Sequence, residues 1–232
     1  MKLYTTIPEA GNKYFISTSE GGLNPFTPRP KGSKLRFQNC TFFAAGTLAQ
    51  NSGVWITPTN AENFCAVGSQ LHKLIVSDVP IQGALAVWRS GQIGNGSDGA
   101  GHVAQVAAIE KDCITTAESG WHCTSKSFWT EKRAFIKKTF KPTAAAKYSF
   151  VGYLYPCSAL KLGSVGEYVK ELQTSLAALG YMRGSEIDGD FGRITLGGVC
   201  AWQLEHKSEC GEVDGIAGGK TLSSIARALL TR

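Results

Sequence analysis

The sequence predicts an α+β protein followed by a small all-helical part. Three observations predict it: helical patterns come first along the chain, short alternating apolar runs come next, and helical amphipathicity returns towards the C-terminus. The 232 residues are 43% hydrophobic and 18% charged, which is the composition of a chain that buries a core. Wholesale disorder, collagen and coiled coil are therefore excluded, and one large domain or two small ones are expected.

Two helices are expected after a turn-rich lead-in. Asn39 is a good N-cap for a helix that begins at Cys40, and Asn51-Ser52-Gly53 carries the signals that end it. Thr59-Asn60-Ala61-Glu62 resembles a capping box and predicts a second helix that reaches about Leu74. The first helix places Cys40 in its first turn.

Five strands are expected after the helices. Each is a short apolar or alternating run, and the runs are 84–88, 102–109, 114–118, 134–139 and 150–155. A glycine-rich loop, 90–101, separates the first two. No GxxxxGK[ST] pattern follows a strand there, so the loop is not predicted to cradle a phosphate.

The part that begins near Leu160 is expected to be helical. Its apolar stripe has spacings of three, four and seven and consists of Val165, Tyr168, Val169, Leu172, Leu176 and Leu179. Residues 188–195 and 214–221 share the frame D-G-x-x-G-x-x-T, an internal repeat. In each copy we expect Asp-Gly to form a tight turn, the later Gly to take a positive φ and the Thr to cap a helix. The predicted domains are 1–156 and 157–232.

Charge is uneven between these parts. Residues 1–156 hold 16 Lys and Arg against 9 Asp and Glu, a net +7, and the remainder holds 8 against 9, a net −1. A basic first part fits an anionic polymer such as nucleic acid, an acidic membrane surface or a bacterial wall. The densest basic stretch, 132–138, is short and has no nucleic-acid fingerprint, so nucleic acid is not expected. The sequence has no long apolar run, so we expect no signal peptide and no stable membrane association.

Cys40 is the candidate nucleophile. A thiol in the first turn of a helix lies at the positive end of the helix dipole, which favours the reactive thiolate. His102, at the start of a strand, is the best-placed base, and Glu118 could orient its ring. A two-residue turn at Lys111-Asp112 would put Glu118 on the face opposite His102, so this hypothesis predicts an odd-length connection or a β-bulge.

Metal and glycosidase chemistry fit less well. His102, Asp112, His122 and Cys123 lie near one another in sequence, but neither HExxH nor paired CxxC occurs, so zinc is the less favoured alternative. Glu118 is the one carboxylate of the first part in a suggestive setting, which argues against paired-carboxylate hydrolysis. We expect no metal and no cofactor, and an odd number of cysteines, seven, suggests that most are reduced.

Five short motifs occur in a characteristic order: Asn39-Cys40-Thr41, then 83–88, 101–104, 118–121 and 152–156. In that order they resemble the CHAP domain, the cysteine- and histidine-dependent amidohydrolase/peptidase family, over about residues 1–156. The resemblance implies a papain-like fold in which helices pack on an antiparallel sheet. The remainder, from about Cys157, resembles the small helical peptidoglycan-binding domain built on two D-G-x-x-G-x-x-T units.

The resemblance carries over roles to individual residues. It makes Cys40 the nucleophile, His102 the general base and Glu118 the orienting group. The Cys40 N–H would hold the oxyanion, with Gln38 or Asn39 as a second donor, and Trp88 and Trp121 are candidates for the substrate groove. One departure is at Gly120, where many family members have Asn; Ser119 or His122 could substitute.

The two resemblances point to one polymer, bacterial peptidoglycan. Together they imply a monomeric bacteriophage endolysin, an amidase or endopeptidase that waits in the host cytoplasm until a holin opens the membrane. A wall-remodelling hydrolase and a secreted antibacterial toxin would use the same cysteine. A non-enzymatic wall-binding protein, in which Cys40 is only a buried thiol, is the alternative from another class.

Overall fold

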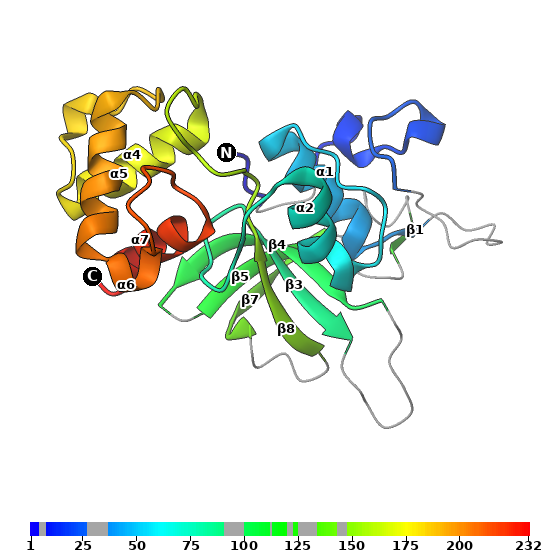
Figure 1. The fold of residues 1–232 in the computed structure, drawn as a ribbon. Helices are drawn as coiled ribbons and strands as arrows, with labels where there is room; N and C mark the ends of the chain where they lie inside the picture. Colours follow the sequence, from blue (N-terminus) through cyan, green and yellow to red (C-terminus); the bar gives the residue numbers. More distant parts are fainter. Residues whose placement is uncertain are drawn as a thin grey trace. The chain divides into compact units, whose positions relative to one another are not determined.

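The computed structural model describes residues 1–4, 8–26, 37–90, 100–111, 113–119, 123–124, 134–142 and 148–232. The chain forms two compact units. One consists of Met1–His72 and Pro80–Pro156, and the other of Lys73–Val79 and Cys157–Arg232. Each unit is described by itself below (Figure 1).

The helices of the N-terminal unit are η1 (Lys13–Phe15), η2 (Thr18–Glu20), α1 (Cys40–Ser52), η3 (Ala61–Asn63) and α2 (Phe64–His72). Of these, α1 begins and ends where the sequence predicts, whereas the helical turns η1 and η2 in the lead-in were not predicted. The Asn39 side chain accepts the Phe42 N–H at the start of α1, and Gly53 ends the helix with a φ of 72°.

The predicted capping box at 59–62 is wrong. The N-cap of η3 is Asn60, and its side chain makes no capping hydrogen bond. The Glu62 N–H instead donates to the carbonyl of Ala100, 3.2 Å away. A partner from a distant segment therefore replaces the local cap, and α2 begins only at Phe64.

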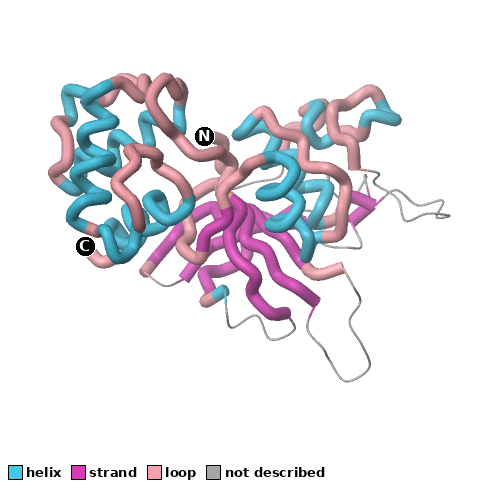
Figure 2. The backbone as a smooth tube through the Cα atoms, in the orientation of Figure 1, coloured by secondary structure: helices cyan, strands magenta, loops and turns pink. Residues whose placement is uncertain are grey.

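The N-terminal unit contains an antiparallel sheet, as predicted (Figure 2). Its strands are β3 (Leu85–Ser90), β4 (His102–Glu110), β5 (Cys113–Ser119), β7 (Ala134–Phe140) and β8 (Tyr148–Leu154). Their spatial order is β8-β3-β4-β5-β7. A separate pair, β1 (Phe37–Gln38) with β6 (Cys123–Thr124), was not predicted, because two-residue strands carry no readable period.

Helices α1 and α2 lie against this sheet, α1 on β4 and β5 and α2 on β8 (Figure 1). The contact is apolar because α1 carries a run of fully buried residues from Phe42 to Ala49. The lead-in is fastened to the same helix: the Asn24 amide donates to the carbonyl of Phe42 at 2.9 Å and to that of Tyr14 at 3.0 Å. The arrangement is the α+β class expected.

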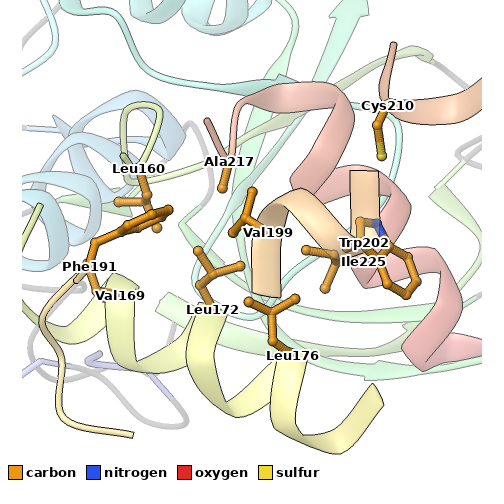
Figure 3. Close-up of a cluster of buried hydrophobic side chains, with 10 residues drawn as sticks. All are labelled: Leu160, Val169, Leu172, Leu176, Phe191, Val199, Trp202, Cys210, Ala217 and Ile225. Carbon is orange, nitrogen blue, oxygen red and sulfur yellow. The ribbon is translucent and has the colours of Figure 1, made fainter. Parts of the chain in front are cut away.

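The C-terminal unit is helical apart from one short strand. Its elements are β2 (Val76–Ser77), α4 (Glu167–Leu179), η5 (Gly184–Glu186), α5 (Arg193–Glu205), α6 (Lys207–Cys210) and α7 (Gly219–Leu230). Its core consists of Leu160, Val169, Leu172, Leu176, Phe191, Val199, Trp202, Cys210, Ala217 and Ile225 (Figure 3). Val165 was predicted to belong to the buried apolar stripe, and this prediction is wrong. The residue precedes α4, forms a β-bridge with Asp190 and is 75% exposed.

The segment Lys73–Val79, which contains β2, is held in the C-terminal unit by polar contacts. The Ile75 N–H donates to the carbonyl of Cys157 at 3.0 Å. The hydroxyls of Ser77 and Ser223 are 2.6 Å apart. Arg227 of α7 reaches Asp78 at 3.2 Å. Seven residues that lie between α2 and β3 in sequence therefore belong structurally to the C-terminal unit.

A buried glutamine organises each copy of the internal repeat. Gln173, 1% exposed, donates to Asp188 Oδ1, the carbonyl of Asp190 and Thr195 Oγ1 at 2.8, 3.0 and 2.9 Å. Its carbonyl accepts the Asp188 and Gly189 N–H groups. Because every polar atom of the side chain is used, the loop 188–195 is tied to α4.

Gln203 repeats this arrangement in the second copy. It donates to Asp214 Oδ1, the carbonyl of Ile216 and Thr221 Oγ1 at 2.9, 3.1 and 3.1 Å, and it accepts the Gly215 N–H at 2.9 Å. The sequence holds a signal for both glutamines, because V-x-x-[LW]-Q occurs at 169–173 and again at 199–203. That signal was missed.

The roles predicted within the D-G-x-x-G-x-x-T frame need correction. The glycine next to the aspartate takes the positive φ, 83° at Gly189 and 71° at Gly215. The later glycine, Gly192 or Gly218, is the extended N-cap of α5 or α7. The threonine is the third residue of the helix, and its Oγ1 accepts a hydrogen bond from the glutamine Nε2 instead of capping the helix.

Candidate active site

Cys40 is the first residue of α1 and is half-buried. The Asn39 side chain fixes this helix start by accepting the Phe42 N–H at 3.0 Å and the Thr41 hydroxyl at 2.7 Å. The first N–H groups of a helix are not used by its own hydrogen bonds and carry partial positive charge. The Cys40 side chain thus lies at the end of α1 where these N–H groups are found.

A β-bulge brings Glu118 to the same face as His102. At the hairpin end Glu110 pairs with Cys113, but beyond the bulge at Ala107 the pairing shifts, and Gln105 lies opposite Ala117. This register puts Glu118 opposite residue 104, two residues from His102, and residues two apart share a face. The predicted bulge is confirmed.

His102 and Glu118 are hydrogen-bonded through the imidazole Nε2 and Glu118 Oε2. The side chain of Glu118 is 3% exposed and that of His102 is 22% exposed. His102 also hydrogen-bonds the Cys40 side chain. The structure therefore links three side chains from α1, β4 and β5 in one chain of polar contacts.

The imidazole is held in its charged form. Burial, the largest single influence, lowers the pKa of His102 because a charged ring is less well solvated inside the protein. The hydrogen bonds and charges of Cys40 and Glu118 oppose it and together raise the pKa of His102 from 6.5 to about 9. At neutral pH the ring is an imidazolium beside the Cys40 sulfur.

Gly101 lets the chain approach closely where it enters β4. Its φ is 68°, and a Cβ at this position would lie 2.3 Å from the carbonyl oxygen of Trp88 and 2.8 Å from the Cβ of Glu62. A side chain would force apart the segments that place His102. The glycine before the histidine is therefore a requirement of packing.

The two tryptophans predicted to line a groove differ in outcome. Trp88 is 2% exposed, and its indole stacks on the ring of His102 with centroids 5.8 Å apart. The role of Trp88 in a substrate groove stays a prediction. Trp121, Gly120 and His122 lie outside the described residues.

The oxyanion candidates are only partly described. The side-chain carbonyl of Asn39 is occupied by helix capping, as above, and Gln38 lies in β1 with its side chain outside the described part. The Cys40 N–H is one of the donors that α1 itself does not use. The assignment of the second donor stays a prediction.

Comparison with protein families gives two matches. The family model described as “CHAP domain” matches residues 30–120, which contain Cys40, His102 and Glu118. The model described as “Putative peptidoglycan binding domain” matches residues 165–225, which contain both repeats. The chain carries a CHAP domain and a C-terminal peptidoglycan-binding domain. Together these domains support a peptidoglycan hydrolase.

Solved structures resemble the chain only remotely. A peptidoglycan-binding protein from Clostridioides difficile, in complex with glutamine hydroxamate, is 22% identical over 60% of this chain and 68% of its own, with a TM-score of 0.29. An N-acetylmuramoyl-L-alanine amidase from Staphylococcus aureus is 21% identical over 57% and 35%, with a TM-score of 0.35. Scores below 0.5 do not establish a shared fold, so the family models carry the assignment. No curated protein matches the chain significantly.

In the part of the chain that the structure describes, no group of three or more His, Cys, Asp or Glu side chains is placed to hold a metal ion. Within the same residues, no helix is both long and apolar enough to cross a membrane. Among the described residues, the thiols of Cys40, Cys65, Cys157, Cys200 and Cys210 are not in disulfide bonds. Any pairing of Cys113 with Cys123 lies outside the description, because the Cys123 side chain is not described.

Proposed function

We propose that this protein cleaves amide bonds of peptidoglycan peptides with Cys40 as its nucleophile. The observation that carries the proposal is the linked arrangement of Cys40, His102 and Glu118 within a CHAP domain. A nucleophile, a base in contact with it and a third group that orients the base are what acyl transfer by a cysteine needs.

The first half of the reaction forms a thioester. The Cys40 thiolate attacks the carbonyl carbon of the amide, and the carbonyl oxygen becomes an oxyanion held by the Cys40 N–H. The carbon–nitrogen bond then breaks while the His102 imidazolium gives its proton to the leaving amine. An acyl group bound to Cys40 and a neutral His102 remain.

The second half releases the acid product. His102, now neutral, takes a proton from water, and the resulting hydroxide attacks the thioester carbonyl. The carbon–sulfur bond breaks, Cys40 leaves as thiolate and His102 is again an imidazolium. Glu118 keeps the ring oriented through both steps by its hydrogen bond to Nε2.

The bond cleaved is either the N-acetylmuramoyl-L-alanine amide or a peptide bond of the stem or cross-bridge. Both are amides and both suit the same three side chains. The C-terminal domain supplies anchoring, because tethering raises the effective concentration of the catalytic site on an insoluble polymer. The expected partner is peptidoglycan, bound by a monomer, with no cofactor.

We further propose that the biological role is lysis of a bacterial host by a bacteriophage, with release from the host cytoplasm through a holin. The combination of a wall-cleaving and a wall-binding domain supports this role. It is tested by producing the protein inside a susceptible bacterium and permeabilising the membrane. We expect lysis only after permeabilisation. Lysis of intact, unpermeabilised cells would instead favour a hydrolase exported by its own host.

The cleavage proposal is tested by mass spectrometry of purified peptidoglycan incubated with the full chain. Stem peptides freed from the lactyl group identify an amidase, and split stems or cross-bridges identify an endopeptidase. Cys40→Ala should abolish the products while wall binding persists, because the nucleophile is lost and the C-terminal unit is untouched.

Cys200→Ala is the matched control, since Cys200 lies on α5 of the C-terminal unit. It should cleave like the parent protein. Substantial cleavage by Cys40→Ala would overturn the mechanism. No cleavage of several wall chemotypes by the parent protein would favour a wall-binding protein without activity.

A further inference from the structure

The least expected contact of the site is the one beneath His102. Trp88 on β3 is the direct cross-strand partner of His102 on β4. The indole and imidazole planes are stacked at 29° with centroids 5.8 Å apart. An indole face attracts a cation placed within about 6 Å of its centre, and His102 is an imidazolium at neutral pH.

The indole is itself held in place on more than one side. Its Nε1–H donates to the carbonyl of Pro142 at 2.9 Å. The ring of Phe150 meets it edge-on at 5.9 Å. The pairing of β3 with β8 shifts between Val87 and Trp88, an irregularity that sets the direction of this residue. A buried indole held in this way presents a rigid, flat surface to the imidazole.

The His102 ring needs a rigid surface of this kind to keep its orientation. An imidazole that bonds both Cys40 and Glu118 must hold its plane within narrow limits, because small misplacements of a catalytic group reduce rates steeply. The hydrogen bond to Glu118 fixes the position of Nε2, but a single hydrogen bond does not prevent the imidazole ring from rotating about it. The stacked indole restrains the ring plane.

We propose that Trp88 is a positioning residue that holds the His102 ring in line with Cys40 and Glu118, and that it does not contact the substrate. This inference rests on the proposed cysteine-dependent hydrolysis. It replaces the groove-lining role expected from the sequence, and the two roles have different kinetic signatures. A positioning residue affects kcat, whereas a groove residue affects mainly KM.

The test compares Trp88→Leu with Trp88→Phe and Trp55→Leu in the full chain. The substrates are soluble muropeptides, and a second readout is the rate of Cys40 alkylation by iodoacetamide at pH 7. We expect Trp88→Leu to lower kcat by about tenfold to a hundredfold with KM unchanged, and to slow alkylation several-fold. Trp88→Phe should recover most of both, because it restores a flat ring under the imidazole.

Trp55→Leu is the matched control, since it removes a tryptophan of the same unit that is stacked on another ring, that of Tyr14, with centroids 5.8 Å apart. It should retain most activity. A rise in KM with unchanged kcat in Trp88→Leu, or an equal loss in Trp55→Leu, would overturn the positioning role. Alkylation separates the two proposals: if the parent cleaves no peptidoglycan but Trp88→Leu still slows alkylation, the proposed function fails and the positioning role stands.

Discussion

The two units use buried polar groups in opposite ways. In the N-terminal unit Cys40, His102 and Glu118 come from three different elements, and they meet through bonds that favour charged forms. In the C-terminal unit Gln173 and Gln203 are neutral, and each ties one nearby loop to its own helix. The first arrangement suits chemistry, which needs charges that change. The second suits a rigid binding module, which needs a fixed shape.

Glu118→Gln tests the charged side of this comparison and should have the largest effect. The variant keeps the shape of the side chain but removes the charge that helps to raise the pKa of His102. We expect hydrolysis of soluble muropeptides to fall by about a hundredfold or more. Glu110→Gln, an exposed carboxylate at the far end of β4, is the control and should be unaffected. A near-normal rate in Glu118→Gln would remove that residue from the mechanism.

Gln173→Leu and Gln203→Leu test the neutral side. Each leaves buried hydrogen-bonding groups without partners, and we expect a loss of about 3 kcal/mol in the free energy of unfolding of the C-terminal unit. Gln173→Leu should be the more damaging, because Gln173 makes one bond more, to the Asp188 N–H. The measurement is urea unfolding followed by amide hydrogen exchange of α4, α5 and α7 in an otherwise unchanged chain.

Gln70→Leu, an exposed glutamine on α2, serves as the control for these variants. Cleavage of soluble muropeptides should persist in both variants at temperatures where the chain stays folded. If the two C-terminal variants had the same free energy of unfolding as the parent protein, the glutamines would not stabilise the repeats.

Two carboxylates of the C-terminal unit, Asp188 and Asp214, should respond to pH in the opposite direction from His102, with a smaller effect. The raised pKa of His102 contributes stability that is complete below about 6.5 and is lost as pH rises through about 9. Hydrogen bonds from Gln173 and backbone N–H groups lower the pKa of Asp188, and the Ile216 N–H and Gln203 lower that of Asp214. Their contribution is present above the ordinary value of 3.8 and is lost as pH falls below it.

Amide hydrogen exchange read separately in each unit measures this difference. Protection in the N-terminal unit should fall from pH 6.5 to 9 after correction for the intrinsic exchange rate, and protection in the C-terminal unit should fall below pH 4. The second effect should be the weaker, because Asp188 and Asp214 are exposed and their interactions are screened by solvent. Parallel loss in both units across the same pH range would contradict the comparison.

The parts of the fold that were predicted correctly depend on local chemistry. The cap at Asn39, the stop at Gly53 and the alternation of the strands are all readable within a few residues. The bulge was predicted only as a condition of the catalytic hypothesis, since nothing at Ala107 announces it. Within the candidate site, Cys40 has a local signature as the first residue of a capped helix, whereas the roles of His102 and Glu118 come from the resemblance to the CHAP domain.

The errors have the opposite origin. The capping box at 59–62 failed because Ala100, distant in sequence, supplies the carbonyl for the Glu62 N–H. Val165 was placed in a core stripe because periodicity alone does not show where α4 begins. The contact of Trp88 with His102 is a feature that was not predicted, because it depends on strand register, which a sequence pattern does not specify.

The segment Lys73–Val79 has a consequence for taking this protein apart. The chain passes from the N-terminal unit into the C-terminal unit after His72, returns after Val79 and leaves again after Pro156. The two units are therefore not simply consecutive in the sequence. A fragment that starts at Cys157 would lack Ser77 and Asp78, the partners of Ser223 and Arg227. Grafting the binding module onto another enzyme therefore requires carrying these seven residues with it, or closing the surface that they cover.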